Sequence, residues 1–111
     1  MSEKTTALGH GLTLPVDQIA ELCHRYNVIE LSVFGSVLRD DFGAGGYVDF
    51  LVVFRDNDYG PWMGKLHGME RDLGALLGRE VDLVPKEDVL RSENWIRRKH
   101  ILSTAQVIYG A

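Results

Sequence analysis

Gly35, Ser36 and Arg39 follow a short apolar stretch in the middle of the chain, and their types and spacing suit the binding of a phosphate. Gly35 has no Cβ, so a phosphate group can approach its backbone closely. Ser36 is expected to open a short helix, where free N–H groups and the positive end of the helix dipole attract an anion. Arg39 lies one helical turn further on and can reach the same region. Taken alone, the pattern favours a plain strand-to-helix turn, and an anion site is the functional alternative.

Asp49 and Asp82 each lie in a short apolar stretch, VDFLVVF and EVDLV. An unpaired carboxylate is costly to bury among such residues, so a cation, a helix N-terminus or a metal ion is expected beside it. If the two stretches form neighbouring strands, the two carboxylates can share a divalent cation. A strand edge that faces water is the alternative for Asp82. The two aspartates together, after a Gly-Ser turn, favour the metal site.

The elements that must position these residues follow from hydrophobic periodicity and from Gly and Pro. In chain order we predict a helix over residues 15–26, a strand over 29–34, a short helix from residue 36, a strand over 48–54, a helix over 62–77, a strand over 80–84, a connector or short helix over 86–90 and a helix over 95–109. This alternation predicts an α/β fold with a small mixed β-sheet flanked by helices. The predicted domain covers residues 15–111, and residues 1–14 are expected to form a flexible N-terminal tail.

Length and composition restrict the class of protein. A chain of 111 residues with 45% hydrophobic and 25% charged residues suits one globular domain. Its formal net charge of -4 argues against broad nucleic-acid binding, although a nucleotide site needs only a local field. The single cysteine, Cys23, cannot form an internal disulfide and is expected in the core rather than as a nucleophile. Because there is no signal peptide and no apolar run long enough to cross a bilayer, we expect a cytoplasmic protein without a membrane partner.

The order of these motifs resembles the DNA polymerase β-type nucleotidyltransferase superfamily, and most closely its small members, the minimal nucleotidyltransferases. The resemblance rests on Gly35-Ser36-x-x-Arg39, on the strand with Asp49 and on the later strand with Asp82, and it covers nearly the whole chain. It implies a polymerase β-like fold and transfer of AMP from ATP with Mg²⁺ as the metal. It also implies that Asp49 and Asp82 are catalytic carboxylates and metal ligands, and that the Gly-Ser-x-x-Arg residues bind the nucleotide. Proteins of this kind and size are commonly antitoxins that bind, and in some cases modify, a HEPN-domain toxin.

Tyr47 departs from the family pattern. The family has two aspartates in the strand, separated by one residue, and the first of them corresponds to Tyr47 in this sequence. A phenol is neutral at pH 7 and is a poor ligand for Mg²⁺, because Mg²⁺ prefers carboxylate oxygens. In a two-metal site the paired carboxylates hold the ions that stabilise the attacking and leaving oxygens. We therefore expect impaired catalysis.

Three functions remain open: an active minimal nucleotidyltransferase with a compromised metal site, an inactive binding module that neutralises a HEPN toxin by forming a complex, and an unrelated small α/β domain. The third leaves the Gly-Ser turn and the two aspartates unexplained. Tyr47 favours binding, whereas the rest of the motif favours descent from an enzyme. A homo-oligomer is a further alternative. The run of Arg97, Arg98 and Lys99 favours a solvated helix face, and contact with phosphate or an acidic partner is its alternative role.

Overall fold

The structure, a computed structural model, describes residues 5–7, 13–35 and 47–110. Its centre is a four-stranded sheet of β3 (Val28–Phe34), β4 (Val48–Phe54), β5 (Val81–Pro85) and β6 (Gln106–Gly110), in the order β5-β4-β3-β6. β3 is antiparallel to both β4 and β6, whereas β4 and β5 are parallel. The mixed sheet and the α/β class predicted from the sequence are confirmed.

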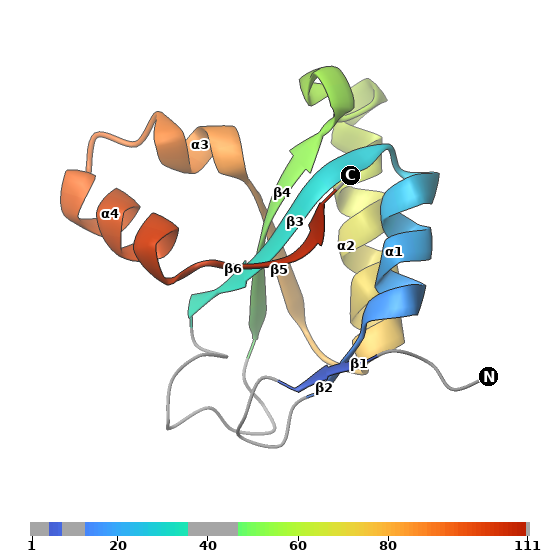
Figure 1. Ribbon diagram of the computed structural model, residues 1–111. Helices are drawn as coiled ribbons and strands as arrows, with labels where there is room; N and C mark the ends of the chain where they lie inside the picture. The colour runs from blue at the N-terminus through green and yellow to red at the C-terminus, as the bar shows by residue number, and fades with distance from the viewer. Residues whose placement is uncertain (1–4, 8–12, 36–46, 111) are drawn as a thin grey trace.

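Helices cover both faces of this sheet (Figure 1). On one face lie α1 (Val16–Arg25) and α2 (Gly64–Leu77), and on the other lie α3 (Lys86–Leu90) and α4 (Trp95–Thr104). The larger core cluster contains Ile19 of α1, Phe50 of β4 and Leu73 of α2. The smaller cluster contains Leu51 of β4 and Ile101 of α4. Neighbouring side chains of β4 thus enter opposite cores, as expected of a strand buried on both faces.

The predicted strands and the first helix are confirmed to within one residue, but the last predicted helix is wrong beyond Thr104. Residues 106–110 form β6, which pairs with β3. The sequence QVIYG carries β-branched and aromatic side chains that suit a strand, and the open edge of β3 supplies hydrogen-bonding partners that a helix would not use. The apolar spacing of this segment fits both the helical repeat and the two-residue repeat of a strand, so pairing with the edge of β3 decides for the strand.

Two shorter segments also differ from expectation. Within residues 1–14, which were expected to be a flexible tail, β1 (Thr5–Ala7) pairs antiparallel with β2 (Thr13–Pro15), and Leu14 is fully buried in the larger core. The helix predicted from residue 62 begins as α2 at Gly64, after the 3₁₀ turns η2 (Arg55–Asn57) and η3 (Pro61–Met63). No helix in the described part of the chain is long and apolar enough to cross a membrane.

Candidate functional site

Asp49 and Asp82 lie on the same face of the sheet, on adjacent strands. They are register partners across the parallel β4–β5 pair, and register partners point to the same face. The next residues on that face, Leu51 and Val84, pack in the smaller core cluster beneath α3 and α4. The carboxylates therefore lie on the face that carries α3 and α4, at the end of β4 where the strand begins. Asp82 is exposed and Asp49 is half-buried, so a ligand can reach both.

Gly35 lies directly against the carboxylate of Asp49. It follows Phe34, the register partner of Asp49 on β3, and its φ of 78° lies in the left-handed region that favours glycine. A Cβ at this position would overlap Oδ2 of Asp49. The sequence argument assigned Gly35 to the approach of a phosphate. The structure adds a second reason for glycine, which is space for the Asp49 side chain.

Ser36 and Arg39 lie outside the described residues, so the phosphate-binding part of the prediction is represented only by Gly35. Tyr47 is described and is 55% exposed, immediately before β4. The next residue, Val48, donates its backbone N–H to the carbonyl oxygen of Glu80 at 3.0 Å, which joins the start of β4 to β5. Tyr47 thus lies at the end of the β4–β5 pair that carries Asp49 and Asp82, and its side chain is open to solvent.

Asp49 and Asp82 offer oxygen donors of the kind that Mg²⁺ prefers. Mg²⁺ is a hard cation that is commonly held by one or two carboxylates together with the phosphates of a substrate. Asp49 and Asp82 supply two such oxygen donors from paired positions of neighbouring strands. Among residues 5–7, 13–35 and 47–110, no group of three or more His, Cys, Asp or Glu side chains could hold a metal ion.

A crevice of about 120 Å³ lies between this face of the sheet and the α3–α4 pair. Two residues that line the crevice lie next to the carboxylates on the same face of the sheet. Phe34 is the register partner of Asp49, and Val84 is two residues after Asp82. The residues that line it are Phe34, Val84, Asp88, Val89, Ser92, Arg97, Arg98 and Ile101. From the sequence alone, the two arginines are expected mainly on a solvated helix face. Their place at the crevice depends on how α4 packs against the sheet. In the sequence, the run of basic residues was the only sign that they could have a role in binding.

Polar contacts hold α3 and α4 over this face. Nζ of Lys86, the first residue of α3, donates to Oε1 of Glu30 on β3 at 2.7 Å. The hydroxyl of Tyr59 donates to Glu87, and burial together with this hydrogen bond raises the pKa of Tyr59, which keeps it a neutral donor. Asn94 caps α4 by accepting a hydrogen bond from the backbone N–H of Arg97 at 3.1 Å. The start of α4, and with it the two arginines, is therefore held in a defined place.

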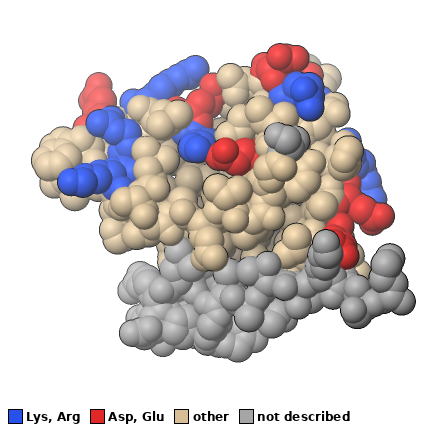
Figure 2. All heavy atoms as spheres, viewed as in Figure 1, with Lys and Arg blue, Asp and Glu red and all other residues tan. Residues whose placement is uncertain are grey.

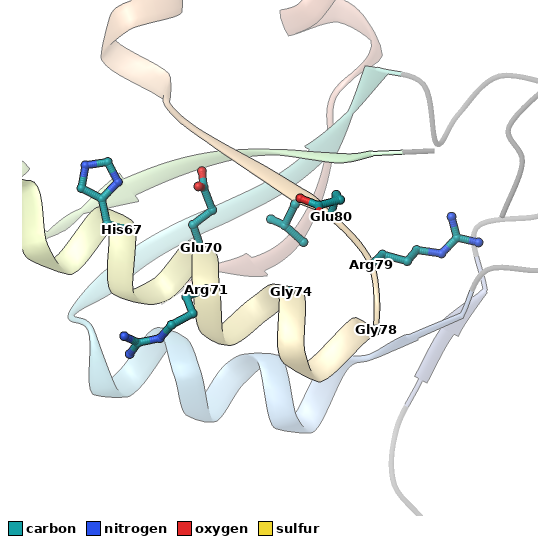
Figure 3. A pocket seen from close by; sticks show the side chains of 8 residues that line it. His67, Glu70, Arg71, Gly74, Gly78, Arg79 and Glu80 are labelled. Atoms are coloured by element: carbon teal, nitrogen blue, oxygen red, sulfur yellow. The ribbon is translucent and has the colours of Figure 1, made fainter. Parts of the chain in front are cut away.

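A larger hollow, of about 660 Å³, lies between α2 and β5 (Figure 3). Its polar side chains do not converge: Arg71 and Arg79 point away from Glu70 in Figure 3. Glu70 itself accepts a hydrogen bond from the backbone N–H of Leu83 at 3.0 Å, so its carboxylate covers part of the outer edge of β5. The hollow thus has a structural explanation, and its size alone does not make it a site.

Cys23 is a core residue, as the sequence predicted. Its side chain is fully buried in the larger core cluster, and burial raises the pKa of the thiol to about 12. Because the thiolate is the nucleophilic form of cysteine, this thiol is inert near neutral pH.

A family model described as a nucleotidyltransferase domain matches residues 16–108. The protein adenylyltransferase MntA of Thermococcus cleftensis is 41% identical over 69 residues, which are 62% of this chain and 67% of that protein.

Solved structures are similar over most of the chain. One, a protein assigned as a minimal nucleotidyltransferase, has a TM-score of 0.62 and 27% identity over 81% of this chain and 85% of its own. Another, the complex of a tri-AMPylated HEPN toxin with an MNT antitoxin from Shewanella oneidensis, has a TM-score of 0.56 and 18% identity over 86% of this chain and 70% of its own. At that identity the second likeness shows the fold alone.

Proposed function

Because the chain belongs to the nucleotidyltransferase domain family, we propose that it is an antitoxin of the minimal nucleotidyltransferase type that binds ATP with Mg²⁺ and neutralises a HEPN-domain toxin. The observation that carries the nucleotide part is the pairing of Asp49 with Asp82 on one face of the sheet, with Gly35 against the Asp49 carboxylate. The antitoxin part is supported by the 41% identity to an MntA protein adenylyltransferase. It is also supported by the names of the fold relatives, which include an MNT antitoxin bound to a HEPN toxin.

Different residues of this chain would bind the metal ion and the phosphates. Asp49 and Asp82 would hold one Mg²⁺ together with the nucleotide phosphates, and a bound Mg²⁺ neutralises phosphate charge and orients the triphosphate. The left-handed turn at Gly35 leaves the space in which the Asp49 carboxylate lies. Ser36 and Arg39 would bind phosphate oxygens through a hydroxyl, backbone N–H groups and a guanidinium. Tyr47, where the family has a carboxylate, adds no negative charge to this end of β4.

The loss of that carboxylate makes catalysis slow in our proposal. Nucleotidyl transfer forms a bond between an acceptor oxygen and the α-phosphorus and releases pyrophosphate. Two-metal sites stabilise the attacking as well as the leaving oxygen, and a neutral phenol cannot replace the charge that holds the second ion. The alternative is a catalytically inactive module that neutralises the toxin by complex formation alone. Tyr47 is the observation that favours this alternative.

The antitoxin role predicts a stable complex. We expect a HEPN-domain protein to be encoded beside this chain. That protein, if expressed alone, should arrest growth of the host cell, and co-expression of this chain should restore growth. A tag on either protein should then recover both, and size-exclusion chromatography should show one co-eluting species. Arrest that persists while both proteins are present and folded would contradict the antitoxin proposal.

The nucleotide role predicts that ATP binds more tightly with Mg²⁺ than without it. Calorimetric titration should show a several-fold gain in affinity on addition of Mg²⁺, because Asp49 and Asp82 help to hold the ion that accompanies the phosphates. Asp49→Asn should remove most of this gain, since it takes away the charge and changes the shape little. Ser36→Ala should weaken binding both with and without Mg²⁺. Equal affinities for the wild type and Ser36→Ala would contradict the phosphate role of Ser36.

A further inference from the structure

Three large apolar side chains at the junction of α3 and α4 lie open to solvent. Leu90 is 53% exposed, Trp95 is 61% exposed and Ile96 is 65% exposed. They come from the last turn of α3 and the first turn of α4. Exposed apolar side chains are ordinary when they are scattered, but a cluster that includes a tryptophan and has a polar rim is typical of a protein-binding surface.

Cations are concentrated in the same stretch of sequence as these side chains. Residues 91–100 hold four of the twelve Lys and Arg side chains of the chain but one of its sixteen Asp and Glu side chains. Arg97 and Lys99 are exposed, whereas Arg91 forms an ion pair with Glu87 at 3.3 Å. Figure 2 shows Lys and Arg side chains gathered on the part of the molecule that carries α3 and α4. This concentration of positive charge occurs in a chain whose formal net charge is -4. We call Leu90, Trp95 and Ile96, together with Arg97 and Lys99, the α4 patch.

The α4 patch is held in place before any partner binds. Asn94 caps the helix through the backbone N–H of Arg97, and Nη1 of Arg98 donates to the carbonyl oxygen of Ser92 at 2.6 Å. The opposite side of α4 is anchored by Ile101, which is buried in the smaller core cluster. A surface that is already ordered loses less conformational entropy on binding, so its contacts contribute more fully to affinity.

The position of the patch relates it to the carboxylates. Ile101 packs with Leu51 and Phe34, which lie on the same face of the sheet as Asp49 and Asp82. Arg97 both belongs to the patch and lines the crevice beside Phe34 and Val84. A protein that docks on the outer side of α4 would therefore be held on the side of the molecule where the nucleotide is proposed to bind.

We propose that the α4 patch is the docking surface for an acidic face of the protein partner, with Trp95 and Ile96 as apolar anchors and Arg97 and Lys99 as the complementary charges. The inference rests on the proposed function, because the partner is the HEPN-type toxin named there. Charge complementarity selects an acidic surface, steers its approach and suppresses basic partners. Tryptophan and arginine are the residues most often found to dominate binding energy at interfaces.

Trp62 provides a matched control for the anchor. It is the same residue type and is more exposed, at 93%, but it lies in η3 at the start of α2. The segment before it carries Asp56 and Asp58 rather than a basic run. If exposure alone made a tryptophan a docking residue, Trp62 would matter more than Trp95. Arg55, which is exposed in η2, is the corresponding control for charge.

The experiment measures the dissociation constant of the purified HEPN partner for variants of the full chain, at low and at high salt. Trp95→Ala is expected to weaken binding about tenfold or more. Lys99→Glu is expected to weaken it severalfold at low salt, with a smaller loss at high salt, because exposed charges are screened. Trp62→Ala and Arg55→Glu are expected to bind like the wild type. All four changes are at exposed positions, and circular dichroism checks that each variant is folded.

The outcomes separate this inference from the function on which it rests. If the wild type does not bind the partner, the proposed function fails and the inference fails with it. If the wild type binds and Trp95→Ala and Lys99→Glu bind equally well, the antitoxin proposal stands and the docking surface is wrong. A loss with Trp62→Ala instead would place the interface on the β4–α2 connection. If Lys99→Glu abolishes binding of a single-stranded RNA oligonucleotide but leaves partner binding unchanged, the patch is a nucleic-acid surface, which also overturns the inference.

Discussion

Replacement of Tyr47 by aspartate is expected to raise Mg²⁺-dependent transfer of AMP by about 10²-fold or more, because each ~1.4 kcal/mol of added transition-state stabilisation is tenfold in rate. The change would restore a carboxylate two residues before Asp49, at the end of β4 where Asp82 is paired with it. The position is 55% exposed, so an aspartate side chain fits there without repacking a core. A second metal ion could then be held beside the first.

The measurement is incorporation of label from α-labelled ATP into the co-purified HEPN partner. Tyr47→Phe is the matched control, since it alters the hydroxyl but adds no charge, and it should leave the rate unchanged. Asp49→Asn or Asp82→Asn in the Tyr47→Asp background should abolish the gain. Strong incorporation by the unmodified chain would show that another group completes the metal site. No incorporation by Tyr47→Asp would leave partner binding as the remaining function.

Gly35→Ala is expected to combine a loss of stability with a loss of nucleotide affinity. Gly35 has a φ of 78°, and an L-residue with a side chain in the left-handed region costs roughly 1–2 kcal/mol. The new Cβ would also overlap Oδ2 of Asp49, so the carboxylate must move. We therefore expect the affinity for ATP with Mg²⁺ to fall about tenfold, since a displaced carboxylate no longer holds the ion in place.

Gly78→Ala separates the two effects. Gly78 also has a positive φ, 65°, at the C-terminal end of α2, but no atom lies within 4 Å of a Cβ built there. Chemical denaturation should show a similar loss in the free energy of unfolding from backbone strain in both variants, with any further loss confined to Gly35→Ala. ATP titration should show weakened binding for Gly35→Ala alone. Equal nucleotide affinities in the two variants would mean that the contact between Gly35 and Asp49 does not matter for the site.

Local sequence patterns predicted most of the elements that carry the site. The apolar runs around Asp49 and Asp82 indicated two strands, and both were confirmed as β4 and β5. Such runs are informative because β-branched and aromatic side chains pack well on the pleated surface of a buried strand. The first helix followed in the same way from its apolar spacing and from the proline at its start. The sequence also placed Gly35 at the turn after β3, where the structure has a positive φ.

The tertiary structure decided what depends on partners distant in sequence. The pairing of Asp49 with Asp82 is set by strand register across 33 positions of sequence, and a shift of one residue would turn one carboxylate to the other face. Residues 106–110 became β6 rather than the end of a helix, because β3 offered an open edge whose backbone groups need partners. The place of Arg97 and Arg98 beside the crevice follows from the burial of Ile101. The sequence by itself thus determined which residues could do the chemistry, since side-chain type and backbone preference are local properties. Only packing and strand pairing, which join distant segments, decided which of those residues lie together.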